Sequence, residues 1–205
     1  MRIIIIGAGT TAIMVADILV QDHNFKIEGF VGTEEEEAEL GGKNVYGKLP
    51  FLGSRSIMGK LKDDGVVGFI SAIGNNYNRE KRYYEAELLG LTPINAISRH
   101  AIIEPSVRVG KGIIISAGCI LSHGVWIGNN TMIDSSCIVE IFTEIGENCH
   151  LYPGSIIGGQ CEIGRNVTFS PRSTVKHNTR IGKNQIIKSG SVINKDLEDL
   201  IRNQK

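Results

Sequence analysis

A glycine-rich loop near the N-terminus contains residue types that bind phosphate. Gly7-Ala8-Gly9-Thr10-Thr11-Ala12 follows an apolar stretch and precedes an apolar-periodic segment at Ile13–Gln21. This GxGxxA order between a strand and a helix is typical of mononucleotide-binding βα units. The glycines let the backbone approach a phosphate, and the helix N-terminus stabilises its negative charge. The loop therefore predicts a phosphate site.

The four cysteines do not form a metal or redox motif. Cys119, Cys137, Cys149 and Cys161 include no CxxC pair, which argues against zinc and against redox chemistry. Each cysteine occupies a position that holds small residues elsewhere in the same repeat. We therefore interpret them as small buried hydrophobes and predict no metal.

The elements that must position a site include a hexapeptide repeat in the C-terminal half. From Ile103 to Ile193 every sixth residue is apolar, for sixteen consecutive positions. A period of six fits neither a helix nor an alternating strand and is the signature of a parallel β-helix. Glycine follows every third apolar position, which fits a corner that needs permissive dihedrals and gives about five coils of eighteen residues. These pairs are Val109-Gly110, Ile127-Gly128, Ile145-Gly146, Ile163-Gly164 and Ile181-Gly182.

The N-terminal half has a different, α/β pattern. About ninety residues hold only half of a dinucleotide fold, so a mononucleotide-type ligand fits better than NAD. The acidic run Glu34–Glu37 is interpreted as a solvated loop. Strands are predicted at Arg2–Gly7, Lys26–Val31 and Val66–Ile73, and helices at Ile13–Gln21 and Glu80–Leu89.

Composition excludes several classes of protein. Lys and Arg number 22 and Asp and Glu number 22, so the net charge of zero gives no global attraction to nucleic acid or an anionic membrane. No apolar run is long enough for a spanning helix, and the short apolar N-terminus reads as a first strand. We expect a cytoplasmic protein with a Rossmann-like domain at 1–95 and a β-helix domain at 96–195. Residues 196–205 are expected to form a tail or short helix that covers one end.

Several stretches match a known family: Ile5–Gly9, Asn44–Gly47 with Pro50–Gly53, Ala72–Asn76 with Arg79, and the coils. In these the chain resembles the bacterial sugar acyltransferases that include UDP-4-amino-sugar N-acetyltransferases, of bacillosamine and perosamine types, and sialic acid O-acetyltransferases. The resemblance covers nearly the whole chain. It implies a left-handed β-helix that forms a homotrimer, with acetyl-CoA in the groove between neighbouring helices and a nucleotide sugar on the Rossmann-like domain.

The resemblance also implies which residues bind the nucleotide sugar. Gly9, Thr10 and Thr11 would face the phosphates. The family has an aspartate after the second strand, but here that region reads Phe30-Val31-Gly32-Thr33-Glu34, so the nucleobase stays open. The remaining residues expected around the pocket are Gly7, Gly32, Thr33, Gly74, Asn75 and Asn76.

The catalytic coil departs from the family. Its motif V-E-H-D-C-x-I-G corresponds to Val139–Gly146, where the histidine general base is replaced by Ile141 and its acidic partner by Phe142. The second family histidine, which contacts the acetyl group, corresponds to His150. The glycine pair near the thioester corresponds to Gly158-Gly159.

The missing pair predicts which nucleophile is acetylated. A sugar hydroxyl needs a general base, whereas an activated amine with a pKa of about 8 is partly neutral at cytoplasmic pH. We therefore predict an acetyl-CoA-dependent N-acetyltransferase of a nucleotide-linked amino sugar in bacterial glycan biosynthesis, without the usual histidine base. Candidate residues for acetyl binding or proton handling are His150, Glu140 and His123. His123 and His177 share the coil position of Ile141 and should stack along one edge with it.

Two further groups are candidates for binding CoA. Backbone N–H groups near Gly158-Gly159 could stabilise an oxyanion. Lys188 and Lys195, and also Lys176, could bind the CoA pyrophosphate. Alternative functions are sugar O-acetylation, a non-catalytic trimeric nucleotide-sugar-binding protein, and an NAD oxidoreductase, the last suggested by Gly7–Ala12 alone.

Overall fold

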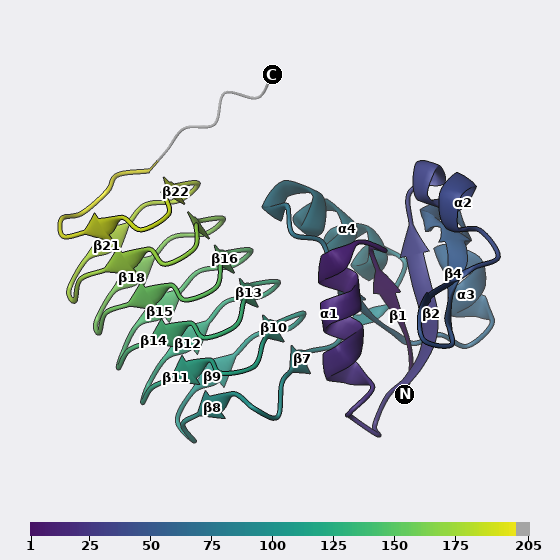
Figure 1. Cartoon of the computed structure of the whole chain (residues 1–205), viewed down its shortest axis with the longest axis horizontal. Coiled ribbons are helices and arrows are strands. Elements are labelled where there is room, and N and C mark those ends of the chain that lie inside the picture. The colour runs from purple at the N-terminus through teal and green to yellow at the C-terminus, as the bar shows by residue number, and fades with distance from the viewer. Residues whose placement is uncertain (200–205) are drawn as a thin grey trace. The chain divides into compact units, whose positions relative to one another are not determined.

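The chain folds into two compact units. The structure, a computed structural model, describes residues 1–199, and its units are Met1–Ala96 and a second that begins at Ile97 (Figure 1). Strand β7 (Ala96–Ile97) lies at the junction. Of the predicted tail, residues 200–205 lie outside the described residues.

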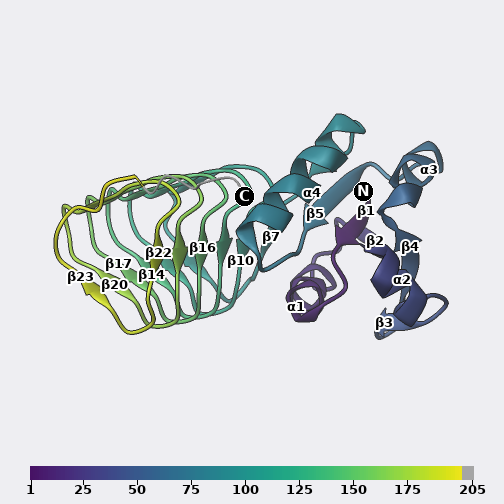
Figure 2. The ribbon, with the colours of Figure 1, turned by 90° about the horizontal axis from the view of Figure 1, so that it is seen from above.

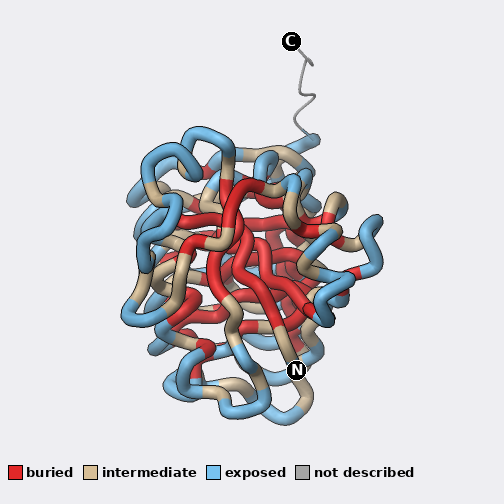
Figure 3. The backbone as a smooth tube through the Cα atoms, turned by 90° about the vertical axis from the view of Figure 1, so that its right-hand side faces the viewer, coloured by how far each residue is buried: buried red, intermediate tan, exposed pale blue. Residues whose placement is uncertain are grey.

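The first unit is a six-stranded sheet in the order β3-β4-β2-β1-β5-β6, parallel except for the β3–β4 hairpin. The first strand passes from half-buried to fully buried as it enters the core (Figure 3). Met58 and Tyr83 from two of the helices pack with Ile4 and Ile6. Its strands are β1 (Arg2–Ile6), β2 (Lys26–Gly32), β3 (Asn44–Tyr46), β4 (Leu49–Ser54), β5 (Gly68–Ser71) and β6 (Thr92–Pro93). Its helices are α1 (Thr10–Leu19), α2 (Glu34–Leu40), the 3-10 turn η1 (Arg55–Ile57), α3 (Met58–Asp63) and α4 (Asn76–Leu88).

The prediction of a loop at Glu34–Glu37 was wrong, because these residues form the first turn of α2. Thr33 caps the helix: its hydroxyl accepts the Glu36 N–H and the Glu36 carboxylate accepts the Thr33 N–H. This reciprocal capping box satisfies two N–H groups that a helix end otherwise leaves without partners. The four carboxylates also lie at the positive end of the helix dipole, which stabilises them.

The second unit is a parallel β-helix, in which each strand pairs with the strand eighteen residues later (Figure 2). This confirms the fold predicted from the period of six. One sheet contains β10 (Ile114–Ile115), β13 (Met132–Ile133), β16 (His150–Leu151), β19 (Thr168–Phe169) and β22 (Ile186–Ile187). A second contains β8 (Ile102–Ile103), β11 (Ile120–Leu121), β14 (Ile138–Val139), β17 (Ile156–Ile157), β20 (Thr174–Val175) and β23 (Val192–Ile193). The third contains β9 (Arg108–Val109), β12 (Trp126–Ile127), β15 (Glu144–Ile145), β18 (Glu162–Ile163) and β21 (Arg180–Ile181).

The β-helix interior holds the residues that the repeat predicts. The branched apolar positions and all four cysteines form one buried cluster, and each cysteine is a free thiol. A hydrogen bond with Cys119 and burial both raise the pKa of Cys137, and burial raises the pKa of Cys161. Leu197 packs against the last coil and pairs with Ile181, so the described start of the tail lies over this end.

The repeated corner glycines serve a different purpose from the one predicted. They do not have positive φ; instead, a Cβ on Gly128 would lie 2.6 Å from the Glu147 nitrogen, and one on Gly146 would lie 2.8 Å from the Arg165 nitrogen. Glycine is therefore required by the close approach of the next coil. Positive φ falls two residues later, at the asparagines 130, 148, 166 and 184.

These asparagines form a hydrogen-bonded ladder along one corner. The Asn130 Nδ2 donates to the Asn148 Oδ1 at 2.9 Å, Asn148 donates to Asn166 at 3.2 Å, and Asn166 donates to Asn184 at 2.8 Å. Asparagine tolerates left-handed backbone better than most residues, so one residue type satisfies both the turn and the stacking between coils.

Candidate active site

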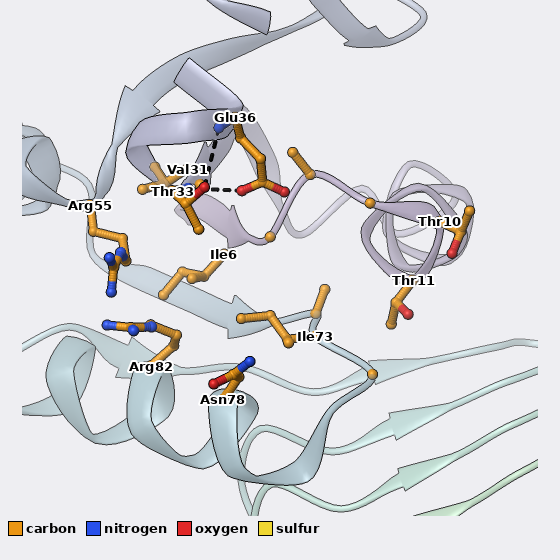
Figure 4. A pocket seen from close by; sticks show the side chains of 16 residues that line it. Ile6, Thr10, Thr11, Val31, Thr33, Glu36, Arg55, Ile73, Asn78 and Arg82 are labelled. Atoms are coloured by element: carbon orange, nitrogen blue, oxygen red, sulfur yellow. Dashed lines mark hydrogen bonds between the residues drawn. The ribbon is translucent and has the colours of Figure 1, made fainter. Parts of the chain in front are cut away.

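The first unit contains a cavity of about 300 Å³ at the carboxyl ends of β1, β2 and β5. Its lining comes from the β1–α1 loop, the start of α2, η1 and α4 (Figure 4). The carboxyl edge of a parallel sheet, where crossovers leave in opposite directions, is the usual ligand crevice of α/β folds.

Seven of the nine residues predicted to bind the nucleotide sugar line this cavity. They are Gly7, Gly9, Thr10, Thr11, Gly32, Thr33 and Gly74. The other two do not line it, because α4 begins earlier than predicted and uses both side chains. The Asn75 side chain accepts the Asn78 N–H as the N-cap, and the buried Asn76 accepts a hydrogen bond from Arg79.

The glycine loop has the geometry of an anion site. Gly7 has φ of 115°, and a Cβ there would lie 2.7 Å from the Ala72 carbonyl oxygen, so only glycine fits. Gly9 is the N-cap of α1 and offers no side chain to the first turn of the helix. Gly9, Thr10 and Thr11 line the cavity, so the start of a ten-residue helix lies at its wall with the positive end of the helix dipole.

Four lining residues with polar or charged side chains were not identified from the sequence: Glu36, Arg55, Asn78 and Arg82. Glu36 reaches the cavity because its carboxylate folds back onto the Thr33 N–H at 2.8 Å. The T-x-x-E pattern of Thr33–Glu36 is a capping-box signal that would have revealed it. A carboxylate thus lies at the cavity although the aspartate expected from the family is replaced.

The two arginines are held by one acid. The Arg82 Nη1 donates to the Glu85 Oε1 at 2.6 Å, and the Arg55 Nη1 lies 3.9 Å from the Glu85 Oε2. Without that carboxylate the two guanidinium groups would repel each other. No signal in the sequence identified either arginine, because Arg55 follows β4 and Arg82 lies on α4, and only the fold brings the two to the same carboxylate.

In the second unit, Ile141 and Phe142 lie exposed at one corner of the β-helix. The Phe142 N–H donates to the His123 carbonyl oxygen and the Gln160 N–H donates to that of Ile141. The Asn178 N–H donates to the Gly159 carbonyl oxygen, so His123 and His177 lie on the same edge as Ile141, as predicted. Phe142 is 54% exposed with φ of 54°, and its ring lies edge-on to His123 at 5.4 Å. Neither Ile141 nor Phe142 can accept a proton.

His150 forms a pair with an acid that the sequence did not single out. Its Nε2 lies 2.9 Å from the Asp134 Oδ2, and its ring stacks on Tyr152 with centroids 3.9 Å apart. The histidine is buried, and Asp134 is mostly buried. The register Met132↔His150 places Asp134 beside it, so the period of eighteen is the signal that could have found it.

The weaker candidates occupy exposed positions. The exposed His123 has its Nδ1 2.9 Å from the Ser106 Oγ, and Ser106 also accepts the Gly124 N–H. His123 and Ser106 line an open hollow with Arg108, Trp126 and Glu144. Glu140, Lys188 and Lys195 are exposed too, and their roles stay predictions.

The Gly158 N–H donates to the Val175 carbonyl oxygen at 2.8 Å, as part of the ladder between coils. The oxyanion role expected of N–H groups near Gly158-Gly159 stays a prediction. Gly159 lies directly against Ile141, since a Cβ there would be 3.2 Å from the Ile141 carbonyl oxygen.

Residues 1–199 include no group of three or more His, Cys, Asp or Glu side chains that could hold a metal ion. Within the same range, no helix is both long enough and apolar enough to cross a membrane.

Each unit matches a known protein family, and solved structures match the two units together. Residues 2–86 match the PglD N-terminal domain, and residues 142–177 match the bacterial transferase hexapeptide. A histidine-to-alanine variant of GDP-perosamine N-acetyltransferase from Caulobacter crescentus, in complex with CoA and GDP-perosamine, has a TM-score of 0.89 and 28% identity. The match covers 97% of this chain and 91% of that one. Across both units the chain is therefore similar to bacterial hexapeptide-repeat sugar acyltransferases.

Other solved structures share the fold. The acetyltransferase domain of PglB from Neisseria gonorrhoeae, in complex with acetyl coenzyme A, has a TM-score of 0.58 and 22% identity, covering 97% of this chain and 93% of that one. WeeI from Acinetobacter baumannii has a TM-score of 0.52 and 16% identity, covering 97% of each chain. No curated protein matches the chain in sequence. The matches to the hexapeptide transferase model and to the CoA-bound acetyltransferase make the protein an acyltransferase.

Proposed function

We propose that this acyltransferase transfers an acetyl group from acetyl-CoA to the amino group of a nucleotide-linked amino sugar. The observation that carries the proposal is the likeness, over 97% of the chain, to an enzyme bound to CoA and GDP-perosamine. The cavity of the first unit supports the proposal, because the glycine loop and the start of α1 that line it are suited to binding phosphate. The cytoplasmic location also stays a prediction.

The nucleotide sugar would bind in the cavity of the first unit. Its phosphates would accept hydrogen bonds from the N–H groups at the start of α1, beside Thr10 and Thr11. Glu36 would accept hydrogen bonds from the ribose hydroxyls, as an acid after the second strand does in related α/β folds. Asn78 offers a further donor and acceptor at the cavity wall.

The chemistry follows from the nature of the nucleophile. The neutral amine attacks the thioester carbonyl, an N–C bond forms, and the C–S bond breaks to release the CoA thiolate. The proton lost from nitrogen passes to water or to the thiolate. Because an activated amine has a pKa of about 8, a useful fraction is neutral without a histidine at position 141.

His150 would contact the acetyl group, the role that the resemblance gives it. Asp134 would act as a positioning residue, because its carboxylate on Nε2 fixes the tautomer and the orientation of the ring. Tyr152 would hold the ring from one face.

The test is turnover of a set of GDP-, UDP- and dTDP-linked amino sugars with acetyl-CoA, followed by release of free thiol. The expected product is an amide, which resists hydroxylamine, whereas an ester would be cleaved. His150→Ala should lose most activity and the exposed His177→Ala should keep it. An ester product, or full activity of His150→Ala, would contradict the proposal.

One observation favours a second candidate, a non-catalytic nucleotide-sugar-binding protein. Ile141 and Phe142 remove both the general base and its acidic partner while the cavity of the first unit is retained. Calorimetry with acetyl-CoA separates the two functions, because an enzyme binds this donor and a nucleotide-sugar scaffold does not.

A further inference from the structure

The cavity of the first unit has two ends of different chemistry. Thr10 and Thr11 lie at one end, beside the start of α1, and Arg55 and Arg82 lie at the other (Figure 4). A ligand whose phosphates occupy the helix end would direct its nucleoside toward the arginines. The two guanidinium groups would then face the nucleobase.

Glu85 holds these guanidinium groups together. It accepts from the Arg82 Nη1 at 2.6 Å and lies 3.9 Å from the Arg55 Nη1. The Arg82 side chain is only 14% exposed and that of Arg55 32%, so both are partly fixed before a ligand arrives. Glu85 engages one nitrogen of each arginine, and the other N–H groups of each fork remain to be shared with a ligand.

A guanidinium group has only donors, so it selects a nucleobase edge that has only acceptors. Guanine presents O6 and N7 side by side, which matches the arginine fork with two hydrogen bonds. Adenine and cytosine have an amino group on the same edge, and this hydrogen-bond donor would face the N–H donors of the arginine. Uracil and thymine offer a single oxygen there, beside a carbon.

We propose that Arg55 and Arg82 recognise guanine through O6 and N7, and that the nucleotide of the substrate is a guanosine diphosphate. The inference rests on the proposed function, because it takes the cavity as a nucleotide site. Glu85 is the positioning residue of this recognition.

The test is calorimetric titration of the full-length protein with GDP, UDP, CDP and ADP. GDP should bind about tenfold or more tighter than CDP and ADP, since a bidentate arginine–guanine pair discriminates by about 1–3 kcal/mol. In Arg82→Gln this preference should fall at least fivefold. Arg2→Gln is the matched control, because Arg2 also pairs with a glutamate but does not line the cavity.

Arg82→Lys separates recognition of the base from binding of a phosphate. Lysine keeps the charge but has no fork, so the variant should lose the preference for GDP while binding of all nucleotides stays measurable. Equal weakening of all four nucleotides in Arg82→Gln would mean a phosphate contact and would overturn the inference. ADP binding as tight as GDP would overturn it too, and leave the proposed function intact. Failure of the wild-type protein to bind any of the four would overturn both.

Discussion

Phe142 has a backbone conformation that is costly for its side chain. A bulky residue at φ of 54° is strained by about 1–3 kcal/mol. The corresponding residues in the coils before and after are Gly124, Gln160 and Asn178, all with positive φ. The ring packs over Gly124, where a Cβ would lie 2.6 Å from it, and against His123. The loss of the family's acidic residue therefore also changes the packing of this corner.

We predict that Phe142→Asn raises the free energy of unfolding by about 1 kcal/mol, because asparagine tolerates left-handed backbone. Urea denaturation measures the change. Gln160→Asn, one coil later and at φ of 58°, is the control and should change stability by less. A loss of stability in Phe142→Asn would mean that the contact with His123 outweighs the strain.

At the level of single residues, the sequence predicted which residues share a coil position better than it predicted which side chains contact each other. Residues 123, 141 and 159 stack as the period of eighteen predicts. Asp134 and Glu36 were missed, because each reaches its site through a contact with a residue whose position depends on the fold. Asp134 meets His150 across a coil, and Glu36 folds back onto the Thr33 backbone.

Among the elements, the β-helix could be predicted almost completely. Only a few types of side chain fit its interior, and they recur every six residues, so the period of six identifies the buried positions. The first unit was predicted less well, because β3, β4 and α3 have no comparable periodicity. The corner glycines were predicted at the right spacing but for the wrong reason. Glycine is required there because the backbone of the next coil approaches closely.

The asparagine ladder is an element whose contribution can be measured. Asn148 is buried and bonds to asparagines on both sides, whereas Asn178 has similar φ but is exposed. Glycine accepts this φ, so replacement by glycine isolates the side chain. We predict that Asn148→Gly lowers stability by about 2 kcal/mol, because loss of a partner in a buried hydrogen bond costs about 1–3 kcal/mol.

Asn178→Gly is the matched control for this prediction. It should change stability by no more than about 0.5 kcal/mol, as exposed substitutions generally do. Thermal or urea denaturation measures both variants. Equal losses would show that the ladder adds nothing beyond its backbone geometry.

The cysteines give a prediction for the β-helix interior as a whole. Because burial and the bond with Cys119 raise the pKa of Cys137, and burial raises that of Cys161, these thiols stay protonated at neutral pH. The hydrogen bond with Cys137 lowers the pKa of Cys119, but all four thiols are buried and closed to a reagent. A thiol reagent such as DTNB should therefore label none of the four cysteines in the native protein and all of them in denaturant. Rapid labelling of native protein would show that the coils open.

At the scale of the whole molecule, the resemblance predicts a homotrimer. Trp126, Ile141 and Phe142 are large exposed apolar side chains, and such side chains on a β-helix surface are candidates for contact between chains. Sedimentation equilibrium should give three times the chain mass of 22.3 kDa. A single-chain mass at micromolar concentration would contradict the prediction.

The central claim is that the substrate amine reacts without a histidine base, and the pH dependence of kcat/KM tests it most directly. We predict a rise with pH that has one inflection near the pKa of the amine, at about 8, and that is unchanged in His123→Gln. A further inflection near pH 6.5, the ordinary pKa of histidine, that disappears in His123→Gln would contradict the account.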